Sequence, residues 1–120
     1  MLDSRSLTTA TVIGTVLQLA MVIAGHFVPY VRDHVFMFGG MGISALAGLL
    51  YGRAASGFGA AALGGAVAGA VCALIGIAVS VFLGDTAAMI LAFGTISSAV
   101  AGAIGGIVGR LIGGTRGASA

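Results

Sequence analysis

The chain has 120 residues, of which 59% are hydrophobic and only 7% are charged, and its formal net charge is +2. Soluble domains carry about 25% charged residues, so the composition excludes an ordinary soluble domain and predicts that lipid is the main solvent. All five basic residues are isolated arginines. A nucleic-acid-binding surface needs clustered basic residues and is therefore not expected.

Charged residues divide the chain into uncharged intervals, which are 6–31, 34–52, 54–84 and 86–109. A helix of about 20 residues crosses the hydrocarbon core of a bilayer, so each interval can hold one crossing. We expect helices near 7–29, 35–52, 58–83 and 87–111, followed by a tail at 112–120. The sequence thus predicts one all-α domain over residues 1–120, an integral membrane bundle of four transmembrane helices. Its connections are short, so consecutive helices should be antiparallel neighbours.

Local signals support these boundaries. Pro29 should end the first helix, because proline cannot continue the hydrogen-bond ladder. Asp33, Ser56 and Asp85 should be the N-caps of the three later helices, since their side-chain oxygens can accept free amide hydrogens. The first apolar stretch is longer than the core of a signal peptide and lacks an Ala-x-Ala cleavage site, so we expect the first helix to be retained.

The arginines predict the orientation. Four crossings place Arg5, Arg53, Arg110 and Arg116 on one side of the membrane and only Arg32 on the other. Short loops rich in basic residues stay in the cytoplasm. We therefore expect a multi-pass protein of a bacterial inner membrane with both termini cytoplasmic.

Small residues recur at every fourth position of the third expected helix and form a glycine zipper, which comprises Ala60, Gly64, Ala68, Cys72, Gly76, Ser80 and Gly84. Large branched residues form the adjacent row, and 87–111 repeats the pattern. Small residues let helices approach closely in lipid. We expect 58–83 and 87–111 to cross closely, with 7–29 peripheral or packed through polar contacts. The residues expected to mediate helix packing are Gly40, Ser44, Gly48, Gly64, Ala68, Cys72, Gly76, Gly102, Gly105 and Gly109.

A short repeat links the second and fourth expected helices, because Ser44–Gly48 aligns with Ser98–Gly102 and Gly52 then aligns with Gly106. Duplication of a helical hairpin would explain this similarity. So would a shared glycine- and alanine-rich composition.

The chain has a pattern of glycine-rich helix ends around a basic loop. The pattern comprises Gly48 to Gly52, Arg53, Gly64-Gly65 and Gly102 to Gly109. In this pattern the chain resembles a loose class of small, uncharacterised four-helix bacterial inner-membrane proteins. The resemblance implies a four-helix membrane fold and brings no known activity with it.

Two groups of polar residues are candidates for function. Gln18 lies near the middle of the first expected helix, where its amide could form an interhelical hydrogen bond or contact a solute. The second group surrounds the first outer loop and comprises His26, Tyr30, Arg32, Asp33 and His34. It suits an interfacial loop or polar contacts at a pore. A metal or haem site that uses His26 and His34 would need further ligands, so no metal site is predicted and a metal- or haem-associated protein is kept as a third alternative.

No charged residue lies deep in an expected helix, whereas membrane enzymes and ion-coupled transporters usually keep such residues there. We therefore expect no enzymatic activity and no cofactor. The expected function is self-association, or service as an accessory subunit of a membrane assembly. The alternative is a small oligomeric transporter or channel for a neutral or lipid-like solute. The expected partners are the lipid bilayer, further copies of the chain or another membrane protein.

Overall fold

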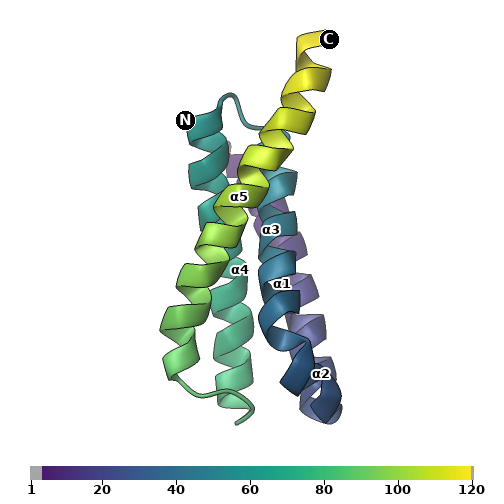
Figure 1. Cartoon of the computed structure of the whole chain (residues 1–120), viewed down its shortest axis with the longest axis vertical. Coiled ribbons are helices and arrows are strands. Elements are labelled where there is room, and N and C mark those ends of the chain that lie inside the picture. Colours follow the sequence, from purple (N-terminus) through teal and green to yellow (C-terminus); the bar gives the residue numbers. More distant parts are fainter. Residues whose placement is uncertain (1–3, 120) are drawn as a thin grey trace.

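The computed structural model describes residues 4–119, and the side chains of these residues except 32, 33, 37 and 114–119. Its helices are α1 (Ser4–Phe27), α2 (Pro29–His34), α3 (Phe36–Gly52), α4 (Phe58–Phe82) and α5 (Met89–Ser119). The four long helices run side by side along the longest axis, with α2 at one end and the C-terminal end of α5 at the other (Figure 1). The prediction of an all-α fold is confirmed for the part of the chain that the structure describes.

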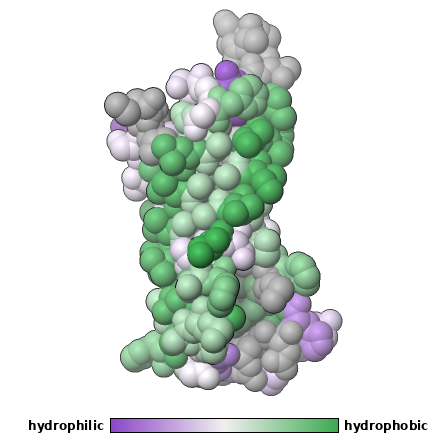
Figure 2. All heavy atoms as spheres, turned by 60° about the vertical axis from the view of Figure 1, so that its left-hand side comes forward, coloured by the Kyte–Doolittle hydropathy of each residue, from purple (hydrophilic) through white to green (hydrophobic). Residues whose placement is uncertain are grey.

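Three helices are long and apolar enough to cross a membrane, namely Ser4–Phe27, Phe58–Phe82 and the Met89–Gly113 part of α5. The 17 residues of α3 make a shorter apolar helix. Large hydrophobic side chains point outward around the bundle; Leu63, for example, is 59% exposed. The face drawn in Figure 2 is mostly hydrophobic along its length and carries hydrophilic residues toward its two ends. Lipid is the solvent that suits such a surface.

The chain breaks at Pro29 as predicted, although it does not enter a loop there. Val28 adopts an extended backbone with φ −120° and ψ 101°, which is the conformation that a following proline favours. Pro29 then starts the short helix α2, because its fixed φ and missing amide hydrogen suit the first helical position. The helix predicted at 7–29 is therefore α1, which begins earlier and ends at Phe27.

The predicted N-caps are wrong at three helices. Asp33 lies inside α2, and the N-cap of α3 is Val35, which forms no side-chain cap. Ser56 lies one residue before the actual cap of α4, Gly57, which also lacks a capping side chain. Asp85 precedes the first residue of α5, Met89, by a full turn of chain. Helix α5 continues to Ser119, beyond the helix end expected near residue 111.

Backbone contacts through glycine join α5 to two neighbouring helices at once. A Cβ atom at Gly48 of α3 or at Gly65 of α4 would overlap the carbonyl oxygen of Gly102. One turn further along α5, a Cβ atom at Gly52 would overlap the Gly106 carbonyl oxygen, and a Cβ atom at Gly106 would overlap the Ala61 carbonyl oxygen. Side chains are excluded from these contacts, so α3, α4 and α5 pack backbone against backbone.

The small-residue row highlighted in the sequence faces other helices than predicted. Gly64 lies against the ring of Tyr51 from α3, and Gly76 lies against Gln18 from α1. The residues of α4 that contact α5 belong to the next row, which comprises Ala61, Gly65 and Gly69. The close crossing of α4 and α5 is thus present, but through a different face of α4.

Helix α1 packs against α3 and α4, and within the described range no Cα atom of α1 lies within 8 Å of one in α5. Its buried positions are Ala10, Gly14, Gln18, Val22 and Gly25. The first four have buried counterparts 54 residues later on α4, which are Gly64, Ala68, Cys72 and Gly76. The hairpins α1–α3 and α4–α5 therefore share both their spacing and their buried faces.

Candidate functional site

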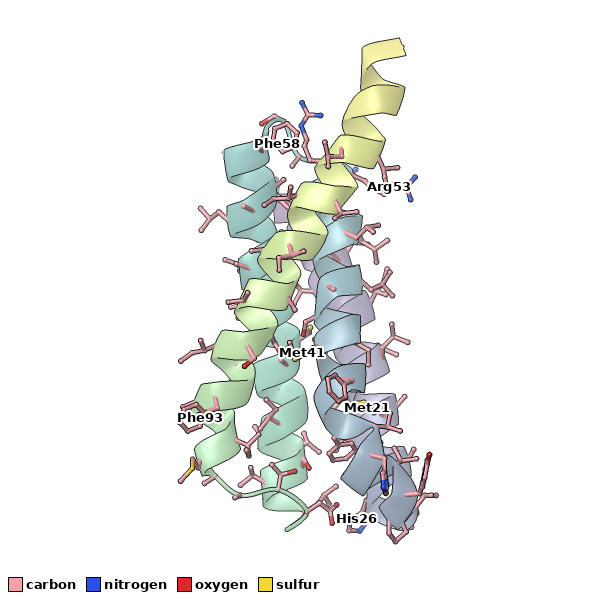
Figure 3. The ribbon with its side chains drawn as sticks, in the orientation of Figure 1. Met21, His26, Met41, Arg53, Phe58 and Phe93 are labelled. Carbon is pink, nitrogen blue, oxygen red and sulfur yellow. The ribbon has the colours of Figure 1, made fainter. Side chains whose placement is uncertain are left out.

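A cleft of about 570 Å³ lies between the four long helices, toward the end of the bundle where α4 connects to α5. Five of its described lining positions carry little or no side chain: Gly40, Ala73, Gly76, Ala87 and Gly94. Its walls are apolar and include Met21, Val22, Phe36, Met41, Ile77 and Ile90. Figure 3 shows Met21 between Met41, nearer the middle of the bundle, and His26 at its end. Ligand sites in proteins have this size and this apolar lining.

Gln18 lies at the inner part of the cleft and is only 3% exposed. Its Nε2 donates hydrogen bonds to the Gly40 carbonyl oxygen at 3.0 Å and to Ser44 Oγ at 3.3 Å. The Gly40 oxygen can only accept, so the nitrogen must face it, and this contact fixes the orientation of the amide. Gln18 Oε1 then points the other way and accepts no hydrogen bond from the described residues.

Ser44 and Cys72 hold Gln18 in place, and we call these three residues the central polar cluster. Ser44 Oγ donates to the Gly69 carbonyl oxygen at 3.2 Å and lies 3.8 Å from Cys72 Sγ. Ser44 and Cys72 are completely buried. Buried polar groups need such partners. The cluster therefore joins α1, α3 and α4 near the middle of the bundle.

Two serines of α5 add hydroxyl groups to the lining. Ser98 is 4% exposed, and Ser97 is the residue before it. Neither hydroxyl forms a hydrogen bond with the residues that the structure describes. A serine in a helix can donate its hydroxyl hydrogen to a carbonyl oxygen one turn earlier. Ser97 and Ser98 form no such bond, so both hydroxyl groups can bond to a molecule in the cleft.

Polar residues surround the mouth of the cleft. Ser80 and Thr86 share a hydrogen bond of 2.6 Å between their hydroxyl oxygens. Gly84, with φ +81°, ends α4; the amide of Asp85 donates to the Ser80 carbonyl and that of Gly84 to the Val81 carbonyl. This pair of bonds is the Schellman arrangement that a glycine in the left-handed region permits.

The turn presents Asp85 to α1, where Asp85 Oδ2 lies 2.7 Å from His26 Nδ1. The His26 side chain is 37% exposed and that of Asp85 is 11% exposed. This contact connects the last turn of α1 to the segment between α4 and α5 at the mouth of the cleft. The residues are 59 positions apart, so sequence spacing gave no sign of the pair. Their shared placement at the outer end of the expected bundle was the one available signal.

The residues predicted to cluster around His26 do not form one group in the structure, because His26 contacts Asp85 instead. Tyr30 and His34 stack on each other within α2, with ring centroids 4.6 Å apart, and both are exposed. The side chains of Arg32 and Asp33 lie outside the described residues. No group of three or more potential metal ligands occurs among the residues described. Polar groups gather instead around Gln18 and around the His26–Asp85 contact.

The remaining packing residues predicted from the sequence lie between helices. Gly105 and Gly109 contact the backbone of α3 at Ala45 and Leu49. Ala68 is fully buried and belongs to the small core cluster that also contains Ala47 and Cys72. None of these three positions lines the cleft.

Comparison with known proteins finds no matching family model, no matching curated protein and no matching solved structure. The function must therefore be inferred from the chemistry of the cleft.

Proposed function

We propose that this chain is a non-enzymatic membrane protein that binds a small neutral, lipid-like solute in the cleft and carries it between the bilayer and the aqueous phase. The cleft itself supports this proposal, because it has the volume of a ligand site and apolar walls that open between four helices. A soluble ligand of high polarity would lose its hydration there without compensation.

The lining favours a neutral guest. Among the described residues that line the cleft, Asp85 alone is ionisable, and it contacts His26. A charged solute would enter a low-dielectric site with no opposite charge at its inner part, which is costly. Proton- or ion-coupled transport would also need ionisable groups at that depth. Uncoupled movement of a neutral molecule needs neither.

In the proposed topology all four long helices cross the membrane. The 17 residues of α3 fall at the lower limit of about 17 to 25 residues for a crossing. Figure 3 shows Arg53 at the opposite end of the bundle from His26. The bias of arginines toward that end supports a cytoplasmic location for it. The mouth of the cleft then opens toward the outer side of a bacterial inner membrane.

Self-association ranks behind solute binding. The expectation of an oligomer rested on a surplus of small residues, but Gly48, Gly64 and Gly102 pack against neighbours within the same chain. These three glycines are therefore occupied within the chain and do not support an interface with a partner.

Filling the cleft tests the proposal. Ser97→Phe places a ring in the cleft, whereas Ile96→Phe enlarges a neighbouring side chain that is 63% exposed on the outside. In proteoliposomes we expect saturable uptake of radiolabelled octyl glucoside, a neutral single-chain amphiphile. Ser97→Phe should abolish uptake and Ile96→Phe should retain it. Equal uptake by both variants, or none by the original chain, would contradict the proposal.

A further inference from the structure

Three polar groups in the cleft have no partner in the described part of the chain: Gln18 Oε1, Ser97 Oγ and Ser98 Oγ. Two of them belong to residues that are at most 4% exposed. Unlike the enclosed, unpartnered Thr95 Oγ1, these atoms are accessible from the cleft that they line. Polar groups on such deeply placed residues need a hydrogen-bonding partner, which here can come only from the contents of the cleft. A guest molecule in the cleft can supply that partner.

The hydrogen-bonding chemistry of the cleft selects the kind of guest. Gln18 Oε1 is an amide oxygen and can only accept a hydrogen bond, while the amide nitrogen already donates to Gly40 and Ser44. The guest must therefore carry an O–H or N–H donor. Ser98 Oγ can donate to the same group or accept from it. A hydroxyl group both donates and accepts, so its chemistry matches Gln18 Oε1 and Ser98 Oγ.

The polar groups lie deeper than the apolar walls. Gln18 precedes His26 by eight residues on α1, which is about 12 Å along a helix. Ser98 follows Met89, the first residue of α5, by nine residues, or about 14 Å. Met21, Val22 and Ile90 line the cleft between these depths and its mouth. A guest bound to Gln18 therefore has its polar end inward and its apolar body toward the mouth.

On the basis of the proposed function, we infer that the cleft recognises an amphiphile with a neutral hydroxyl head group, which binds head inward to Gln18 Oε1 and Ser98 Oγ. A cation would also suit a carbonyl oxygen. The cleft offers no free anionic group beside Gln18, however, since Asp85 lies at the mouth and contacts His26. The size of the cleft limits the guest to a single-chain or ring compound.

The test compares 1-decanol with decyl methyl ether, which has a similar body and no donor. The full chain is reconstituted in nanodiscs with ¹³C-methyl methionine, and the Met21 and Met41 signals report on the cleft. Met89, which is 68% exposed and outside the lining, serves as the internal control. We expect 1-decanol to bind at least about threefold more tightly than the ether, the effect of one net hydrogen bond.

Three variants test which residues cause the preference for 1-decanol over the ether. Ser98→Ala removes a hydroxyl that forms no hydrogen bond within the described residues, so it should fold normally and weaken the preference for 1-decanol. Thr95→Val removes a buried, unpartnered hydroxyl of the same helix outside the lining and should keep the preference. Gln18→Leu should abolish the preference, with thermal unfolding measured to verify its fold.

The outcomes separate the two proposals. Equal affinity for 1-decanol and the ether in the original chain overturns the head-group inference and leaves solute binding standing. Loss of the preference in Thr95→Val as well as in Ser98→Ala also overturns the inference. Binding of neither compound overturns the proposed function, and the inference with it.

Discussion

Individual glycines determine how closely these helices approach. The Gly48 Cα faces the Gly102 carbonyl oxygen directly, whereas Gly42 of the same helix has no atom within 4 Å of an added Cβ. The two residues have the same helix propensity, so only their surroundings differ. A methyl group added at each position therefore measures the backbone contact alone.

Gly48→Ala should lower the free energy of unfolding by about 1 to 3 kcal/mol, because α3 and α5 must separate to accommodate the methyl group. Gly42→Ala should leave stability unchanged or raise it by up to about 1 kcal/mol, since alanine is the better helix former. Thermal and denaturant unfolding in one detergent would measure both variants. Equal effects would mean that the glycine contact does not determine the packing.

For individual residues, the sequence predicts which side chains need partners but not which partners they find. Gln18 was selected because an amide in an apolar helix needs a partner, and it is indeed buried among polar atoms. The sequence does not predict that Gln18 Oε1 lacks a partner, because the orientation of the amide depends on which carbonyl oxygen faces Gln18 Nε2. The His26–Asp85 contact was missed because a turn of defined geometry at Gly84 brings together two distant segments.

At the level of the elements, the uncharged intervals predict the number of long helices and their approximate lengths. They do not predict where each helix ends or which of its faces packs against which neighbour. Both the row containing Gly64 and the row containing Gly65 are small, so spacing alone could not assign each row to a neighbouring helix. The caps failed for a related reason. Pro29 starts a new helix, so Asp33 lies inside α2 and is not positioned to cap α3.

The turn after α4 gives a prediction at this scale. Gly84→Ala forces a side chain into the left-handed region at φ +81° and should cost about 1 to 2 kcal/mol of stability. It should also displace Asp85 from His26 and change the His26 ring signals in NMR spectra. Gly57→Ala is the matched control, because Gly57 has an extended backbone and open space around it. A change in the His26 signals in both variants would contradict this account.

At the scale of the whole molecule, the helices are unequally attached. Backbone contacts through glycine join α3, α4 and α5, whereas α1, within the described residues, packs on α2, α3 and α4 and does not approach α5. Local opening requires least free energy where the fewest contacts are lost. Amide hydrogen exchange in nanodiscs should therefore be faster in the 8–24 segment of α1 than in the 95–109 segment of α5. Equal protection of the two segments would show that α1 is held as firmly as α5.

The lack of contact between α1 and α5 has a mechanical consequence for the cleft. Helices α3, α4 and α5 cannot separate without breaking backbone contacts along α5. Helix α1 forms the remaining wall of the cleft. Near its middle Gln18 forms hydrogen bonds with α3, and at its end His26 contacts Asp85. Because α1 also packs against α3 and α4, loss of the His26–Asp85 contact would free only the last turn of α1, at the mouth of the cleft. In the proposed function, a solute would enter past this pair of side chains.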